Sequence, residues 1–123
     1  MIRLAINGYG RIGRCVLRAL YESPLREQLR IVAINEPADL DTIAHLTRYD
    51  STHGRFVGTV EKGVDSLHIN GDEIVVTHHS SLRELDWSRH NIDVVLECSG
   101  QFLSHRELEM HLENGARHVL LSN

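Results

Sequence analysis

A glycine-rich turn between an apolar strand and a helix constrains the fold of this chain more than any other feature. The turn contains Gly8, Gly10 and Gly13; it follows the apolar run Ile2–Ile6 and leads into a helical pattern over Arg11–Glu22. Glycines at this spacing permit a tight turn, the close approach of a pyrophosphate to the backbone, and close packing of the helix on the strand. The unpaired N–H groups and the positive dipole end of such a helix suit phosphates. The turn therefore predicts a dinucleotide-binding site.

An acidic residue at the end of the next strand supports the same prediction. The second apolar run, Leu29–Ile34, ends at Asn35-Glu36, about twenty residues past the last glycine of the turn. A carboxylate there can accept hydrogen bonds from the adenosine ribose and repels the extra phosphate of NADP. No arginine immediately follows Glu36. NAD is therefore the expected cofactor; the alternative is that Glu36 is an ordinary solvated acid at a strand end.

The rest of the chain alternates between strand-like and helix-like stretches, which is typical of an α/β sheet with crossover helices. We expect a Rossmann-type, doubly wound, mainly parallel sheet with a β-hairpin insertion. The hairpin turn is expected at Asn70-Gly71, because both residues accept a positive φ. The expected strands are Ile2–Ile6, Leu29–Ile34, Phe56–Val60, Ser66–Ile69, Glu73–Thr77, Asp93–Cys98 and Val119–Leu121.

Helices complete the expected architecture, at Arg11–Glu22, at Leu40–Arg48, at Ser81–Arg89 and in a last segment that ends at Asn114. Asp39 or Asp41 is the expected N-cap of the second helix. Ser104 and Glu107 form a capping box at the start of the last helix, and Gly115 stops it. The apolar face of the first helix is expected to consist of Ile12, Val16, Ala19 and Leu20.

Length and composition argue against several classes of protein. The 123 residues suffice for one domain with a core, and 41% hydrophobic with 24% charged residues is ordinary for a globular chain. The formal charge of −4 argues against a nucleic-acid partner. No apolar run approaches the roughly 20 residues that a membrane span needs. The nine histidines fit no common ligand spacing, so no metal site is expected.

Cysteine usage and the two ends of the sequence suggest the context of the domain. Cys15 and Cys98 form no Cys-x-x-Cys pair, which favours the reducing cytoplasm. The chain enters a strand at once, so no leader peptide is expected. A covering helix normally follows each strand of a doubly wound sheet, and none follows the last one here. Residues 1–123 are therefore expected to be one domain, truncated before a further one.

Six stretches of the chain form a pattern that is more specific than the glycine turn alone. They are Ala5–Arg14, Val32–Glu36, Tyr49–Phe56, Ile69–Gly71, Val94–Gly100 and Asn114–Val119. In this order they resemble the glyceraldehyde-3-phosphate dehydrogenases and their close relatives, the erythrose-4-phosphate dehydrogenases. The Tyr-Asp-Ser-Thr-His-Gly sequence that starts at Tyr49 is the most specific of them. Residues in Asn35–Ala38, Ala44–Leu46 and Tyr21–Ser23 favour the erythrose-4-phosphate branch, with the glyceraldehyde branch as the alternative.

The resemblance implies contacts with the adenosine and pyrophosphate parts of NAD. Arg11 and Ile12 match residues whose backbone groups receive the pyrophosphate in the family, and Glu36 matches the acid that binds the ribose. One departure concerns the adenine. The family usually carries an arginine near it, whereas this chain has His79-Ser80.

The resemblance also implies contacts with the nicotinamide half and shows what these residues lack. Ser99 and Gly100 match small residues that let the cofactor lie across the sheet, and Ser122 matches a serine near the nicotinamide. The family's nucleophilic cysteine stands in a Ser-Cys-Thr-Thr-Asn motif that does not occur in residues 1–123. Cys98 follows a buried strand and Cys15 sits within a helix, where a buried inert thiol is expected, so neither is the expected nucleophile.

The function that the resemblance implies is that of the NAD-binding domain of a sugar-phosphate aldehyde dehydrogenase, without catalysis of its own. In this family a cysteine attacks the aldehyde and hydride passes to the nicotinamide, and the full-length protein is expected to be a homotetramer. Asp50 and His53 are expected to serve the loop structure and subunit contacts. Two alternatives remain open: a self-sufficient nucleotide-binding module without catalysis, and a structural remnant that no longer binds.

Overall fold

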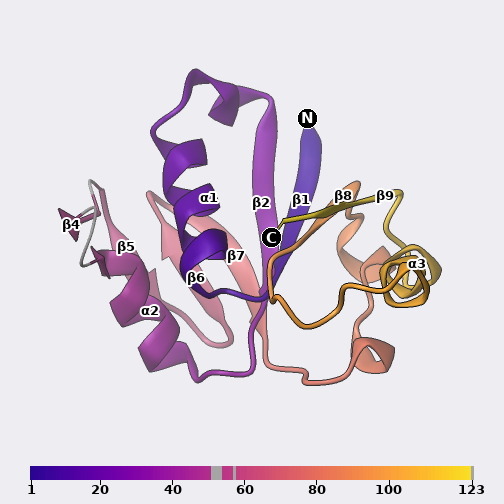
Figure 1. Cartoon of the computed structure of the whole chain (residues 1–123). Helices are drawn as coiled ribbons and strands as arrows, with labels where there is room; N and C mark the ends of the chain where they lie inside the picture. The colour runs from indigo at the N-terminus through magenta and orange to yellow at the C-terminus, as the bar shows by residue number, and fades with distance from the viewer. Residues whose placement is uncertain (51–53, 57, 123) are drawn as a thin grey trace.

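A seven-stranded mixed sheet forms the centre of the structure, a computed structural model that describes residues 1–50, 54–56 and 58–122. Figure 1 shows how its strands and helices are arranged. Its strands are β1 (Ile2–Asn7), β2 (Leu29–Asn35), β5 (Val60–Lys62), β6 (Ser66–Ile69), β7 (Asp72–Thr77), β8 (Val94–Glu97) and β9 (His118–Leu121). They lie in the order β5-β6-β7-β2-β1-β8-β9. The five strands from β7 to β9 are parallel, and β5 and β6 join them through antiparallel pairs. A separate ribbon pairs β3 (Tyr49–Asp50) with β4 (Gly54–Arg55).

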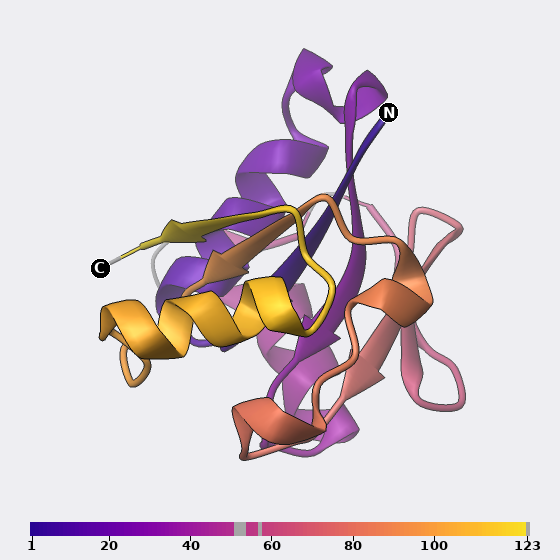
Figure 2. The same ribbon diagram turned by 90° about the vertical axis from the view of Figure 1, so that its right-hand side faces the viewer.

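Helices cover both faces of the sheet. α1 (Arg11–Tyr21) and α2 (Leu40–Arg48) pack on one face, and α3 (His105–Glu113) packs on the other (Figures 1 and 2). Short 3-10 helices occur at η1 (Pro24–Glu27), η2 (Leu82–Glu84) and η3 (Ser88–His90). The chain builds outward from β1 to β2 and β7, then returns to the other side of β1 with β8 and β9. This is the predicted Rossmann-type, doubly wound α/β fold with its hairpin insertion.

Two apolar layers, one on each face of the sheet, form the core. The side chains of strand β2 do not alternate strictly between the two layers. Val32 is an extra residue that has no partner on β1, so the alternation shifts there. Ile31 and Ile34 therefore lie in the layer under α1 and α2, whereas Val32 and Ala33 lie in the layer on the α3 side. The continuous apolar run that predicted this strand is thus buried on both faces, as parallel strands are.

The predicted apolar face of α1 is correct at Leu20 and wrong at its other three residues. Ile12 and Ala19 are exposed and Val16 is only half-buried. Leu20 is buried together with Gly13, Leu17 and Arg18. Gly13 sets this orientation because it has no Cβ to separate the helix from β1. Arg18 can be buried because its guanidinium donates to three backbone carbonyls at the end of α2 and in β4.

Signals that are local in sequence predicted the turns and caps correctly. Asp39 caps α2, and Ser104 and Glu107 form the reciprocal capping box of α3. Asn70-Gly71 turns the hairpin between β6 and β7 with φ angles of 52° and 87°. Gly115 follows the end of α3 with a φ of 112°. Each of these features depends on residues only a few positions apart.

The helix predicted over Ser81–Arg89 is wrong, because the structure has the two short helices η2 and η3 there. Leu85 between them adopts an extended conformation, with a φ of −78° and a ψ of 137°. Leu82, Leu85 and Trp87 are all buried. One continuous helix would turn Trp87 away from the two leucines, so the interrupted path is the one that buries all three.

The strand predicted over Phe56–Val60 is also wrong, because β5 begins only at Val60. Phe56 is buried, but its N–H donates to the carbonyl of Arg48 at the end of α2 instead of pairing in the sheet. Gly58 has a φ of 136°, which no strand residue adopts. His53 and the rest of 51–53, for which a structural loop was expected, lie outside the described residues, as does residue 57.

Candidate cofactor site

A pocket of about 320 Å³ lies where the carboxyl ends of the central strands meet. Ligands of open α/β sheets bind at such a point, where the strand order changes direction. Four of the predicted cofactor residues line the pocket, namely Gly8, Gly10, Glu36 and Ser99. His79 and Ser80, where an adenine contact was in question, line it as well.

The other predicted cofactor residues lie beside the pocket. Arg11, Ile12 and Gly13 carry the glycine turn into the first turn of α1. Gly100 follows β8 with a φ of 73° and is exposed. Ser122 follows β9 at the same edge of the sheet, where its N–H donates to the Glu97 carbonyl at 3.0 Å.

The glycine turn has a geometry that only glycine permits at two of its three positions. Gly8 has a φ of 91°, and a Cβ there would lie 2.4 Å from the Cα of Ser99. A Cβ on Gly13 would lie 2.6 Å from the Gly8 carbonyl oxygen. Gly10 differs, because a Cβ there would meet no protein atom within 4 Å. The space beside Gly10 is therefore open toward the pocket.

The N-terminus of α1 has the features of an anion-binding helix end. Gly10 is its N-cap and has no side chain to satisfy the first N–H groups, and the first turn contains no acidic residue. Arg11 and Ile12 in this turn are exposed. A helix end of this kind presents N–H donors and a partial positive charge, which is the environment that a pyrophosphate needs.

The carboxylate of Glu36 is fixed beside the glycine turn. Its Oε1 accepts a hydrogen bond from the N–H of Tyr9 at 2.8 Å, and its Oε2 accepts one from the N–H of Ala38 at 2.9 Å. Each carboxylate oxygen has a second lone pair, so ribose hydroxyls can still be accepted. Glu36 thus joins the end of β2 to the turn, which sequence reasoning did not anticipate.

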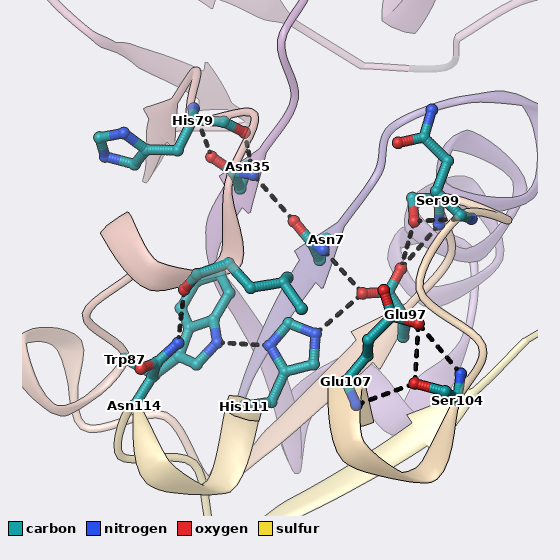
Figure 3. A network of polar contacts seen from close by, with 12 residues as sticks. Asn7, Asn35, His79, Trp87, Glu97, Ser99, Ser104, Glu107, His111 and Asn114 are labelled. Carbon is teal, nitrogen blue, oxygen red and sulfur yellow. Dashed lines mark hydrogen bonds and ion pairs between the residues drawn. The ribbon is translucent and has the colours of Figure 1, made fainter. Parts of the chain in front are cut away.

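A network of buried polar side chains crosses the floor of the site and was also missed (Figure 3). Asn35 Nδ2 donates to Asn7 Oδ1 at 2.8 Å, and Asn7 Nδ2 donates to Glu97 Oε1 at 2.7 Å. At its other end, Asn35 Oδ1 accepts from the hydroxyl of Thr77 and from the N–H of His79. The carboxyl ends of β7, β2, β1 and β8 are therefore linked through side chains as well as through the sheet.

Glu97 lies at the β8 end of this network and is fully buried. Its Oε2 accepts from the N–H and the hydroxyl of Ser99 at 3.0 and 2.6 Å. Its Oε1 lies 2.8 Å from Nε2 of His111, a fully buried residue of α3. Burial raises the pKa of Glu97, but the hydrogen bonds from His111, Ser99 and Asn7 outweigh it and hold the pKa below its ordinary value. The carboxylate is therefore charged.

His79 lines the pocket and is held by contacts of its own. His79 Nδ1 lies 3.1 Å from Glu84 Oε2, and the backbone N–H of His79 donates to Asn35. The neighbouring His78 is exposed, and its Nδ1 bonds to the carbonyls of Glu36 and Ala38. The two neighbouring histidines therefore bond to different partners.

Cys98 does not have the surroundings of a nucleophile. Burial and the charge of Glu97 raise the pKa of the Cys98 thiol to about 11, so it is protonated at neutral pH. Cys15, expected to be buried in α1, is only half-buried.

Within the described residues, no group of three or more histidine, cysteine, aspartate or glutamate side chains is arranged to hold a metal ion. No helix among these residues is long and apolar enough to cross a membrane.

The fold and the pocket agree with a comparison against known protein families. Residues 2–105 match the family described as "Glyceraldehyde 3-phosphate dehydrogenase, NAD binding domain". The matched residues include the glycine turn, Glu36, the segment after β7 and the segment after β8. NAD is therefore the cofactor of this domain. The chain belongs to the glyceraldehyde-3-phosphate dehydrogenase family and carries its NAD-binding domain.

Proposed function

We propose that this chain binds NAD at the carboxyl edge of its sheet and serves as the cofactor half of a sugar-phosphate aldehyde dehydrogenase. The observation that carries the proposal is the open space beside Gly10, directly before the uncapped N-terminus of α1. In this proposal the backbone N–H groups of Arg11 and Ile12 bind the pyrophosphate. Ser99, Gly100 and Ser122 flank the nicotinamide half. Bound NAD supplies a hydride acceptor at its nicotinamide ring.

Glu36 selects NAD over NADP in this proposal. Its carboxylate is held by Tyr9 and Ala38 and cannot swing away from a ligand without giving up two hydrogen bonds. A ribose 2′-hydroxyl can donate to this carboxylate, whereas a 2′-phosphate would bring a second negative charge against it. Its position at the end of β2, beside the turn, supports this role.

The substrate that we propose for the full-length protein is D-erythrose 4-phosphate, oxidised to 4-phosphoerythronate in pyridoxal phosphate biosynthesis. Sequence matches in Asn35–Ala38, Ala44–Leu46 and Tyr21–Ser23 support this branch. The alternative is glyceraldehyde 3-phosphate in glycolysis, which the family match supports equally. In either case we propose a cytoplasmic homotetramer in which a further domain supplies the nucleophile, and no catalysis by residues 1–123 alone.

The selectivity proposed for Glu36 is tested by titrating NAD and NADP into the chain and into Glu36→Gln. Glutamine keeps the size of the side chain and removes its charge. We expect NAD affinity to fall about tenfold or more and the preference for NAD over NADP to shrink. Glu61→Gln, an exposed glutamate on β5, is the matched control and should leave both affinities unchanged. Equal selectivity in the Glu36 variant and the wild type would refute the assignment.

A further inference from the structure

We propose that His111 is a positioning residue for the cofactor pocket, which it shapes through the buried carboxylate of Glu97. The inference rests on the NAD site proposed above. His111 lies on α3, on the face of the sheet opposite α1, and it is not among the residues that line the pocket. Both of its ring nitrogens are hydrogen-bonded inside the protein, Nδ1 to Trp87 and Nε2 to Glu97 (Figure 3).

The partners of His111 fix where its proton resides. The indole N–H of Trp87 can only donate, so Nδ1 of His111 accepts it, at 3.0 Å. A ring nitrogen that accepts carries no proton, and the proton of the neutral imidazole therefore sits on Nε2. From Nε2 it is donated to Glu97 Oε1, 2.8 Å away. The contact between His111 and Glu97 is thus a hydrogen bond from a neutral ring to a charged carboxylate.

The carboxylate of Glu97, held by His111, also binds two segments that line the pocket. Its Oε1 also accepts from Asn7 at the end of β1, and its Oε2 accepts twice from Ser99 after β8. The backbone of Ser99 packs directly against Gly8, as the 2.4 Å approach of a Cβ on that glycine shows. One carboxylate therefore sets the separation between the glycine turn and the segment after β8. The orientation of that carboxylate depends on His111.

The NAD affinity of folded His111 variants distinguishes a positioning role from a purely structural one. If His111 only stabilised the fold, any variant that still folds would bind NAD normally. If it positions Glu97, a folded variant that lacks the donor binds NAD weakly, and a side chain that restores both hydrogen bonds restores binding. Glutamine is such a side chain, because its amide N–H₂ can donate to Glu97 while its carbonyl oxygen accepts from Trp87.

The first test compares NAD affinity, measured by calorimetry on the 123-residue chain, in wild type, His111→Leu and His111→Gln. His105→Leu is the matched control, because His105 begins the same helix, is exposed and contacts Glu109 at the surface. We expect His111→Leu to bind NAD at least about tenfold more weakly than wild type. His111→Gln and His105→Leu should bind NAD within about threefold of the wild-type affinity. Wild-type affinity in folded His111→Leu would overturn the inference. Failure of the wild type to bind would overturn the proposed site, and the inference with it.

A second measurement applies even where His111→Leu does not fold. Nitrogen NMR of the unmodified chain identifies the protonated ring nitrogen of His111, whose signals are assigned by their loss in His111→Gln. The protein contains one tryptophan, so Trp87 gives a single indole N–H resonance. We expect the Nε2–H form of His111 and a shift of the indole resonance on saturation with NAD. A proton on Nδ1 of His111 would overturn the inference. So would an indole N–H chemical shift that does not change on saturation with NAD.

Discussion

Among single residues, Glu97 is a charged side chain whose burial is costly without hydrogen-bond partners. It is fully buried, and an uncompensated carboxylate in a protein interior costs several kcal/mol. Three residues supply donors that offset this cost, namely Asn7, Ser99 and His111. Because these hydrogen bonds hold the pKa of Glu97 below its ordinary value, its charge is a permanent part of the site. The rigidity of the pocket floor therefore depends on an ionised group.

Replacing Glu97 by glutamine should expose this dependence. Glu97→Gln should lower the free energy of unfolding by about 3 kcal/mol at neutral pH, because an amide N–H₂ would face hydrogen-bond donors. A carboxyl group whose pKa is lowered by folding stabilises the protein above its unfolded pKa of about 4.3. This stabilisation is lost as the pH falls through the folded pKa, so the difference between variant and wild type should shrink in acid.

Urea unfolding at a series of pH values measures this difference, with Glu109→Gln on the outer face of α3 as the control. The control should show little loss of stability at any pH, because Glu109 is partly exposed and its ion pairs with His105 and Arg106 lie at the surface. A gap between wild type and Glu97→Gln that stays constant from neutral pH to strong acid would show that the charge of Glu97 does not matter.

At the scale of elements, the unit of β1, the glycine turn and α1 holds the site together by close backbone packing. Gly13 brings the first turn of α1 against the Gly8 carbonyl and the side chain of Ile6. This contact rotates α1 so that Leu17 is buried and Ile12 is exposed. The orientation of the helix axis toward the pocket is therefore a consequence of one missing Cβ.

Gly13→Ala should destabilise this unit. The added Cβ would lie 2.6 Å from a backbone oxygen, which cannot move without shifting the turn. We expect a loss of about 1–3 kcal/mol in the free energy of unfolding, the usual cost of overpacking. Thermal and urea denaturation measure it, and Gly10→Ala is the matched control because a Cβ at Gly10 meets no protein atom. Equal stability of the two variants would contradict this account of the turn.

How far the sequence predicts the elements depends on how local their signals are. The hairpin at Asn70-Gly71 and the capping box at Ser104 follow from neighbouring residues, and both were predicted correctly. The buried face of α1 and the short helices around Trp87 depend on tertiary packing and were predicted wrongly. The Glu97 network joins β1, β8 and α3, so no local pattern encodes it. Its one available signal was a carboxylate directly after the apolar run 94–96.

At the scale of the whole molecule, apolar surface is concentrated around α3 and β9. A groove of about 480 Å³ runs between these two elements, lined by Val94, Leu108, Leu112, Val119 and Leu120 among others. Leu120 is 59% exposed on β9, which is an edge strand of the sheet. Unpaired strand edges with exposed apolar side chains favour association between chains.

We expect this chain to self-associate through that edge. Leu120→Lys places a charge on the edge strand and should shift the chain toward monomer. Val64→Lys is the matched control, because Val64 is 93% exposed but stands in the turn between β5 and β6. Light scattering across a concentration series measures the effect. Strictly monomeric wild type at the highest concentration would contradict the expectation.

In the proposed complex, NAD binds with its pyrophosphate beside Gly10, at the N-terminus of α1. The most direct test is a calorimetric titration of NAD into the wild type and into Gly10→Val. Gly10 has a φ of −79°, which other residues adopt, and open space beside its Cα, so the variant should fold with wild-type stability. We predict saturable binding by the wild type and none that is measurable by the folded variant. Equal NAD binding by the two proteins would show that the pyrophosphate does not lie beside Gly10.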